Sequence, residues 1–479
     1  MKKSFVLTLI GIFALMMVLS ACGGSGSNSG SPSASGSSSP AASPSASASA
    51  SSSDVSASPS ASESEASEFP PLPEEQKKDI SGEITVWSSW ELKSLSTFFN
   101  NTYPNVKVNN VVMQFDELHN KLKTVLAAGK GVPDVVMVDG SKMGEFNTID
   151  GLEDLLQQPY DAGRYKPFFA DSHWQRFESL DGSKLLAIPW TTPPALSFYR
   201  ADVMDAAGFP SDPAEFGEYI QDKDNFINLA KTLAADKKYV YDYDTTIVNV
   251  MTSGVGFFDR DLNWVRNTDQ FVTALDTAKE MKKEKLASNI NFYDDKGAQA
   301  MAKGKTVMFY SGDWGVWDID GKAKDTKGKW RVTNLPFGVY GGMGGASLAI
   351  PSAAKNKLGG WEYIRLNILG MDNSNKEAIQ WSNPTGFLPA FDLAKTEEKP
   401  LEILGGQKPL MMYKELVKNI PLNIPTPLDA KANDIWNKML QEAIDKNTDS
   451  HTALQQIQDA VMKAVSKDRD ALLTKMGKK

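Results

Sequence analysis

One stretch of the chain, GKTVMFYSGDWGVW, places a carboxylate beside two indole rings. Residues 306–310 are apolar with strand character, and the Ser-Gly pair that follows delivers Asp313, Trp314 and Trp317 into a loop. A carboxylate accepts hydrogen bonds from hydroxyl groups and an indole packs on apolar C–H faces, so this combination suits the binding of a sugar ring. The competing interpretation is structural: both Trp side chains pack in a core and Asp313 shapes a turn.

Two further residues follow predicted strands in the same way. Trp90 comes shortly after the apolar segment 84–87, and Asp139 directly follows the segment 134–138. Strands alternate here with amphipathic helices, which is the pattern of a parallel sheet covered by helices. Because the carboxyl ends of parallel strands share one edge, we expect Trp90 and Asp139 at the edge that also carries Asp313. A turn role for Asp139 stays open.

The segment 185–200, LLAIPWTTPPALSFYR, leads out of this unit through several prolines. Prolines stiffen a segment that still has to turn, which indicates a connection between two lobes with Trp190 beside it in a cleft. The alternative is that Trp190 packs beneath the connection. The folded part begins near residue 80 and is too long for one ordinary domain. The glycine cluster at 341–345 lacks the features of a phosphate or dinucleotide loop, so we interpret it as a bend that returns the chain to the second lobe and expect no cofactor.

The N-terminus has the features of an export signal. A basic pair precedes an apolar run at 5–19, and small residues then lead to Cys22, the one cysteine of the 479 residues. We expect residues 1–22 to be a lipoprotein signal peptide and Cys22 to be lipidated, the alternative being an incidental thiol in an ordinary signal peptide. Residues 23–79 are rich in Ser, Ala, Pro and Gly, which predicts a disordered tether.

Charge and local sequence argue against nucleic-acid binding and against calcium binding. The formal net charge is -8 and no basic run interleaves with aromatic residues, so no nucleic-acid partner is expected. Asp259, Asp261 and Asn263 resemble the start of a calcium loop. Trp264 and Gln270 occupy the positions that such a loop gives to Gly and Glu, so we predict a polar hairpin and no metal site.

Six motifs occur in an order that resembles a known family. They are ITVWSSW from Ile84, PDVVMVD from Pro133, LLAIPW and SFYRADVMDAAGF between Leu185 and Phe209, MAKGKTVMFYSGDW from Met301, GGASLAIP from Gly344 and PTGFLPA from Pro384. Each motif is weak alone. Together, the chain from residue 80 onward resembles the family 1 extracellular solute-binding lipoproteins of bacterial ABC importers, a type mostly associated with carbohydrate uptake.

The resemblance implies a fold class and a division of the chain. The expected fold is α/β and two-lobed, periplasmic-binding-protein-like of type II, with a mostly parallel sheet flanked by helices in each lobe and a ligand cleft between the lobes. The N-terminal lobe is expected to hold residues 80–190 and 304–343, and the C-terminal lobe residues 191–303 and 344–479. The positions that the resemblance assigns to ligand binding are Trp90, Glu91, Asp139, Trp190, Tyr199, Asp313, Trp314, Trp317, Tyr340 and Trp381.

The function implied is capture of a carbohydrate by closure of the lobes and its delivery to the permease subunits of an ABC importer. The 11 Trp residues favour an oligosaccharide. The protein is expected to be a monomer at the extracellular face of the cell membrane, anchored through lipid on Cys22, without catalytic residues.

Two alternatives stay open. A secreted hydrolase could pair Asp313 with a second acid, and a sugar-sensing surface lipoprotein could bind the same ligand without importing it. Against the hydrolase, the sequence has no nucleophile elbow and no HExxH motif. His119, His173 and His451 are expected at the surface or at helix ends rather than in a catalytic site.

Overall fold

The computed structural model describes residues 79–371 and 374–479. All of these residues belong to one compact unit of the chain. The predicted signal peptide, Cys22 and nearly all of the predicted tether lie outside the described residues. No helix in the described part of the chain combines the length and the apolar character that crossing a membrane requires.

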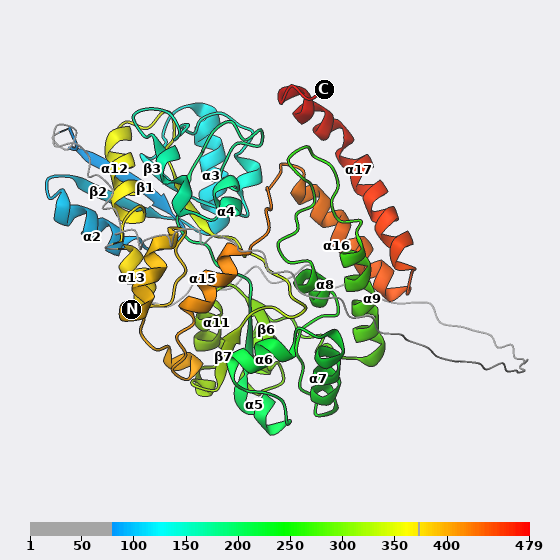
Figure 1. Ribbon diagram of the computed structural model, residues 1–479. Coiled ribbons are helices and arrows are strands. Elements are labelled where there is room, and N and C mark those ends of the chain that lie inside the picture. Colours follow the sequence, from blue (N-terminus) through cyan, green and yellow to red (C-terminus); the bar gives the residue numbers. More distant parts are fainter. Residues whose placement is uncertain (1–78, 372–373) are drawn as a thin grey trace, which may run out of the picture. The chain divides into compact units, whose positions relative to one another are not determined.

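A five-stranded sheet forms one half of the folded part, here called the first half, in the order β2-β1-β3-β8-β4. Its strands are β1 (Glu83–Ser88), β2 (Lys107–Val112), β3 (Val135–Asp139), β4 (Ile188–Pro189) and β8 (Ala346–Ala349). Strand β1 is parallel to β2 and β3, because helices α2 (Lys93–Thr102) and α3 (Phe115–Ala128) carry the chain back between them. Strand β8 is antiparallel to its neighbours β3 and β4. Figure 1 shows α2, α3 and α12 around this sheet.

A three-stranded sheet forms the second half, with β5 in its centre. Strand β5 (Leu196–Arg200) is antiparallel to β6 (Met308–Ser311) and to β7 (Trp330–Thr333). All five residues of β5 are buried, since side chains of a strand alternate between two covered faces. Phe198 enters the apolar cluster on one face and Tyr199 the cluster on the other.

The strand pairing differs from the predicted division of the chain. Residues 304–343 were expected beside the N-terminal strands, but they carry β6 and β7, which pair with β5. Residues 344–479 were expected in the C-terminal lobe, yet β8 inserts between β3 and β4 of the first sheet. The physical reason is that buried strands are mostly apolar and alike in composition, so their composition does not specify which strand they pair with. The glycine cluster at 341–345 therefore returns the chain to the first sheet.

The expected combination of two sheets with flanking helices is confirmed, but the expected strand direction holds only in part. The pairs within β2-β1-β3 are parallel, as predicted, whereas the pairings of the three-stranded sheet are antiparallel. Antiparallel pairing needs no crossover helix between neighbours, and the long helical insertions between β5 and β6 pack around the sheet instead.

Helices cover both sheets, and several begin at an Asp whose side chain accepts from a backbone amide of the first turn. The helices that follow strands of the first half are α4 (Asp171–Gln175), α12 (Lys357–Ile368), η1 (Met143–Glu145) and η2 (Ala162–Phe168). The insertion around the second sheet holds α5 (Ala201–Ala206), α6 (Pro213–Tyr219), α7 (Lys223–Ala235), α8 (Thr246–Met251), α9 (Asp269–Glu284), α10 (Asp295–Ala302), α11 (Gly315–Lys322) and η3 (Lys324–Thr326). The C-terminal part holds α13 (Ser374–Gln380), η4 (Leu388–Leu393), α14 (Ala394–Glu397), η5 (Glu402–Leu404), α15 (Leu410–Lys418), α16 (Asp429–Asp445) and α17 (Ser450–Lys475).

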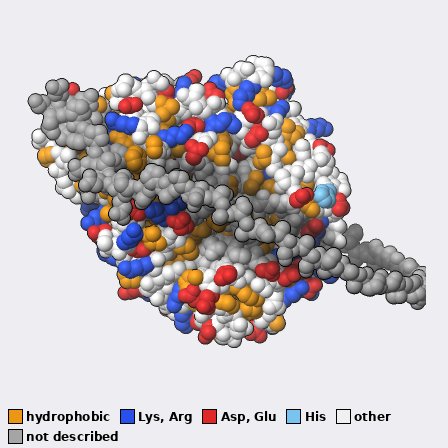
Figure 2. Space-filling model, in the orientation of Figure 1, with side chains coloured by type: hydrophobic (Ala, Val, Ile, Leu, Met, Phe, Trp, Pro, Cys, Tyr) orange, Lys and Arg blue, Asp and Glu red, His pale blue; other side chains and the backbone are white. Residues whose placement is uncertain are grey.

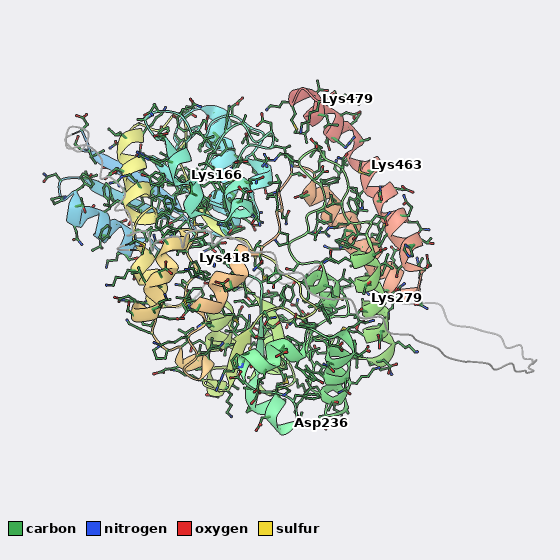
Figure 3. The ribbon with its side chains drawn as sticks, in the orientation of Figure 1. Lys166, Asp236, Lys279, Lys418, Lys463 and Lys479 are labelled. Carbon is green, nitrogen blue, oxygen red and sulfur yellow. The ribbon has the colours of Figure 1, made fainter. Side chains whose placement is uncertain are left out.

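Separate apolar clusters lie on the two sheets. One cluster joins the five-stranded sheet to α2, α3 and α12. A second joins α9, α16 and α17, which lie side by side in Figure 1, and a third joins β5 and β6 to α11 and α15. Many charged side chains lie on the outside: Lys166, Lys463 and Lys479 are exposed, and both signs of charge are interspersed over the face seen in Figure 2. Figure 3 labels these lysines.

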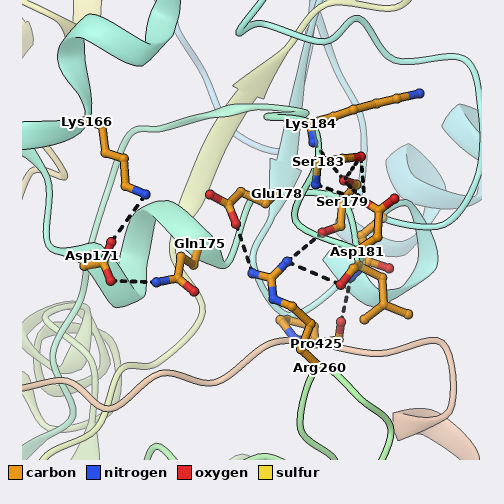
Figure 4. A network of polar contacts seen from close by, with 12 residues as sticks. Lys166, Asp171, Gln175, Glu178, Ser179, Asp181, Ser183, Lys184, Arg260 and Pro425 are labelled. Carbon is orange, nitrogen blue, oxygen red and sulfur yellow. Dashed lines mark hydrogen bonds and ion pairs between the residues drawn. The ribbon is translucent and has the colours of Figure 1, made fainter. Parts of the chain in front are cut away.

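Arg260 links the second half of the fold to the first (Figure 4). Phe258 and Trp264 form an antiparallel bridge, which confirms the predicted hairpin, and Arg260 projects from its turn. Its guanidinium donates to a carboxylate oxygen of Glu178 at 2.9 Å and to the carbonyl oxygen of Ser179 at 3.0 Å. The hairpin therefore has a packing role.

Asp134→Ala is expected to lower stability by about 3 to 5 kcal/mol, since three backbone N–H groups would lose a buried charged acceptor. The Asp134 carboxylate accepts from the amides of Thr85, Lys355 and Asn356 at 2.8 to 3.0 Å and thereby joins β1, β3 and the start of α12. Denaturant unfolding measures the loss. Asp134→Asn retains an oxygen for two of the three amides, so a loss as large as that of the Ala variant would contradict this account.

Candidate functional site

A cavity of about 640 Å³ lies where the edges of the two sheets meet. Seven residues singled out from the sequence line it: Trp90, Asp139, Trp190, Asp313, Trp314, Trp317 and Trp381. The other lining residues are Ser94, Leu95, Thr191, Pro193, Gly345, Ala346, Glu377, Ala378, Asn383 and Pro384. Its size is in the range of pockets that hold small organic ligands. The described lining includes carboxylates and indoles but no Lys, Arg or His.

Strand register explains why residues far apart in sequence share this cavity. The last residue of β3, Asp139, pairs with the first residue of β8, and the end of β4 pairs with the next residue of β8. In the other sheet, Ser311 at the end of β6 pairs with Leu196 at the start of β5. Residues 190–195 link β4 to β5, so a connection too short to separate the sheets brings the two edges together. Asp313 and Trp314 therefore reach the cavity from the second sheet, not from the first as expected.

Two indoles on the side of the first sheet contact one another. The rings of Trp90 and Trp190 lie 5.7 Å apart between centroids, tilted by 34°. Trp190 is only 8% exposed, whereas Trp90 is 41% exposed. The Ser88 hydroxyl donates to the carbonyl oxygen of Trp90 at 2.7 Å and fixes the turn after β1. The buried ring thus supports the exposed ring, which keeps a face free for a ligand.

Hydrogen bonds of its side chain and of its backbone amide hold Asp139 at the edge of the cavity. Its Oδ1 accepts from the amide of Ser141 at 2.8 Å and from the Ser141 hydroxyl at 2.5 Å. Its own amide donates to Nε2 of His119 at 3.2 Å, while Nδ1 of His119 contacts the carbonyl oxygen of Phe115 at 2.7 Å. This pattern requires the neutral imidazole, and burial lowers the pKa of His119 accordingly. The second oxygen of Asp139 is left to accept from a ligand.

Asp313 is the most perturbed acid of the cavity. It follows β6 in the loop that starts α11, and its side chain keeps partial exposure to the cavity. Burial raises the pKa of Asp313 from 3.8 to about 7, and a hydrogen bond from its own backbone opposes the shift. No cation contributes to the shift. Near neutral pH the group can therefore accept from or donate to a hydroxyl, since both of its protonation states are populated.

Comparison with known proteins decides the family. The family model described as bacterial extracellular solute-binding protein matches residues 72–366, more than half of the chain. The chain belongs to this family.

The relatives of this solute-binding protein are distant. An arabinooligosaccharide-binding protein of Bacillus subtilis is 22% identical over 306 residues, which are 61% of this chain and 68% of the relative. A family 1 extracellular solute-binding protein of known structure has a TM-score of 0.69 at 18% identity, covering 80% of this chain and 99% of the other. The binding protein associated with an ABC transporter of B. animalis subsp. lactis, in complex with β-1,6-galactobiose, has a TM-score of 0.62 at 19% identity, covering 81% of this chain and 98% of the other. These structures support the two-lobed fold.

Three of the expected ligand residues do not line the cavity of the solute-binding protein. Tyr199 is completely buried against Phe216, and its hydroxyl donates to the carbonyl oxygen of Ser211 at 2.9 Å. Glu91 and Tyr340 are exposed outside the cavity. For Tyr199 the reason is strand alternation, which directs its side chain into the core behind the sheet.

Sequence reasoning missed several polar lining residues, of which Glu377 and Asn383 are the most informative. Both flank the exposed Trp381, Glu377 on α13 and Asn383 in the turn after it. Their types are common at helix surfaces and turns, so composition alone carries no signal. Proximity to the recognised Trp381 was the one available indication.

Two histidines also differ from expectation. His119 and His173 are buried rather than at the surface, and burial lowers the pKa of His173 to about 3, helped by the charge of Arg176. Neither lines the cavity. Within residues 79–371 and 374–479, no group of three or more His, Cys, Asp or Glu side chains is arranged to hold a metal ion.

Asp313→Asn is expected to remove a pH dependence of stability. Because the pKa of Asp313 is raised from 3.8 to about 7, the native chain binds a proton in this window that the unfolded chain has lost. Stability of the unmodified protein therefore falls as pH rises from about 4 to 7, relative to the Asn variant. Melting curves between pH 4 and pH 8 should show the melting temperature of the variant rising relative to that of the parent protein toward pH 8. A difference that stays constant with pH would contradict the assignment.

Proposed function

We propose that this solute-binding protein captures a neutral oligosaccharide outside the cell and delivers it to an ABC importer. The observation that carries the proposal is the convergence of Trp90, Trp314, Trp317 and Trp381 with Asp139 and Asp313 on one cavity. Three of these indoles are strongly exposed, although exposed indole surface is otherwise unfavourable in water. The arrangement suits a ligand with apolar ring faces and many hydroxyls.

The magnitudes fit the binding of a sugar. A hydrogen bond from a hydroxyl to a carboxylate contributes about 1.5 to 3 kcal/mol, and an aromatic contact about 0.5 to 1.5 kcal/mol beyond its burial. Micromolar affinity corresponds to about 8 kcal/mol after the costs of association. Two stacked indoles and two or three bonds to Asp139 and Asp313 reach this size.

The charges of the cavity favour a neutral over an acidic sugar. Asp139, Asp313 and Glu377 line it, and no basic side chain is among the described lining residues. A uronic acid or a sugar phosphate would place its anion near these carboxylates, and no described lining residue offers a cation to pair with, which is costly in a partly desolvated site.

Delivery follows from the position of the cavity between the two sheets. A ligand that touches both edges stabilises the conformation in which they are closest, and a permease can distinguish that conformation. The relatives support this role: one is described as arabinooligosaccharide-binding, and another is associated with an ABC transporter and binds β-1,6-galactobiose. A family of binding proteins also supports capture over hydrolysis.

The test is a thermal-shift screen of the intact protein against arabino-oligosaccharides, β-1,6-galactobiose, maltotriose, their monosaccharides and galacturonate oligomers. A neutral oligosaccharide is expected to raise the melting temperature saturably, without hydrolysis products, and the galacturonates to have no effect. Release of shortened sugars would support the hydrolase instead. Uptake that persists after deletion of the gene would favour the sensor.

Trp314→Ala is expected to weaken binding of the active sugar by at least about tenfold, because a stacked ring face is lost. Isothermal titration measures the change. The matched control is Tyr340→Ala, since Tyr340 is as exposed as Trp90 but lies outside the cavity. Equal losses of affinity in the two variants would contradict the placement of the binding site in this cavity.

We further propose that lipid on Cys22 anchors the protein to the membrane. The support is the position of this single cysteine directly after an apolar signal segment. Labelled palmitate should enter the parent chain and not Cys22→Ser, and the variant should appear in the soluble fraction. An unlabelled parent chain that is secreted with a free thiol would refute the anchor.

A further inference from the structure

Trp381 contributes an indole that is 53% exposed, on a turn rather than on a helix or strand. A half-exposed side chain on a turn has several rotamers open to it, and a ligand that needs one of them must compensate the lost entropy. What fixes this turn therefore affects the affinity of the cavity.

The turn is held through the next residue, Ser382. Ser382 is 3% exposed and has φ of +59°, a left-handed conformation that is unfavourable for a residue with a side chain. Its hydroxyl donates to Oε1 of Glu398 at 2.9 Å. The amides of Trp381 and Asn383 donate to the carbonyl oxygen of Ala378 at 3.1 and 2.9 Å, which closes α13. With Ser382 turned inward, Trp381 and Asn383 are presented to the cavity.

Glu398 serves two elements at once. It is 4% exposed, and the oxygen that accepts from Ser382 also accepts from the amide of Leu410, the first residue of α15, at 3.0 Å. Burial raises the pKa of Glu398, while these two bonds and Lys408 oppose the shift. A buried acid without hydrogen-bond partners would destabilise the fold. The two bonds that Glu398 accepts, from Ser382 and from Leu410, offset this cost and tie the two elements together.

Helix α15, whose first amide donates to Glu398, also packs against α13. Tyr413 on α15 is 1% exposed, and the charges of Asp313 and Glu398 add to burial in raising its pKa. Leu410 and Tyr413 also share an apolar cluster with Ile379 of α13. Figure 1 shows α11, α13 and α15 close together in this part of the fold.

Glu397 and Lys399, the neighbours of Glu398, also contact α13 and the turn after it. Lys399 donates its amide to the carbonyl oxygen of Gln380 at 3.2 Å, and its ammonium lies 4.5 Å from the ring centroid of Trp381. Glu397 pairs with Lys376 of α13 at 3.0 Å. Three consecutive residues thus contact α13 or the turn after it.

We infer that Glu398 is a positioning residue: through Ser382 it holds the turn that presents Trp381 to the cavity, and it thereby sets the affinity for a sugar face. This inference rests on the proposed function for its effect on affinity. The positioning of the indole itself can be tested without any ligand.

The ligand-free test uses ¹⁹F NMR of the intact protein labelled with 5-fluorotryptophan, in which Trp381→Phe identifies the Trp381 signal. Glu398→Ala and Ser382→Ala should each shift or split that signal and leave the other indole signals in place. Glu398→Gln should retain it, because the amide oxygen still accepts. Asp134→Ala, which removes a buried carboxylate of the first sheet, is the control for general destabilisation and should also retain it.

An unchanged Trp381 signal in Glu398→Ala and Ser382→Ala would overturn the inference, whatever the protein binds. Ser382→Ala keeps the bond from Leu410 to Glu398, so it remains informative if Glu398→Ala does not fold.

The binding test is a double-mutant cycle with arabinotriose or β-1,6-galactobiose as the probe. Glu398→Ala should weaken binding by about 3- to 10-fold when Trp381 is present, the size of one aromatic contact, and by less than about 2-fold in a Trp381→Ala background. Equal losses in both backgrounds would show that Glu398 does not act through Trp381. If neither sugar binds the parent protein, the proposed ligand is wrong, while the NMR result still decides the positioning role.

Discussion

The short connection at residues 190–195 constrains everything at the site. It leaves the carboxyl edge of one sheet at the end of β4 and enters the other at the start of β5, next to the end of β6. The amides of Trp190 and Gly386 continue this link, since Trp190 donates to Ala346 at 2.8 Å and accepts from Gly386 at 2.7 Å. Because backbone hydrogen bonds have little freedom in length, the loop after α13 is tied to the same edge. The cavity is a consequence of these bonds.

The cavity shows a compromise between stability and binding. Trp317 and Trp381 keep more than half of their surface exposed, and Asp313 has its pKa raised to about 7 by burial. Each feature opposes stability: exposed indoles forgo apolar burial, and a buried acid resists ionisation. The rigid support lies one layer further out, where His119 accepts from the amide of Asp139 and Glu398 accepts from Ser382. Binding groups whose placement opposes stability, held by hydrogen-bonded supports, are what a preorganised site requires.

Much of the site could be predicted because its residues follow strands. Trp90, Asp139 and Asp313 each come just after an apolar segment, and the rule that ligands bind at strand ends predicts the shared edge at which all three line the cavity. Tyr199 was misplaced by family resemblance alone, since alternation within β5 sends its side chain into the core. Glu377 gave no signal, because a helix surface normally carries such a residue.

The sequence by itself determined the strands and helices and the loops that carry the indoles and carboxylates of the cavity, since these depend on local pattern and composition. It also predicts the export signal that ends at Cys22. Tertiary structure decided which strands pair with one another. Whether β6 and β8 join the first or the second sheet depends on backbone pairing between segments more than 100 residues apart, and similar apolar strands carry no local code for that choice. The same holds for Glu398, whose effect on Trp381 exists only because folding brings one buried oxygen to both Ser382 and Leu410.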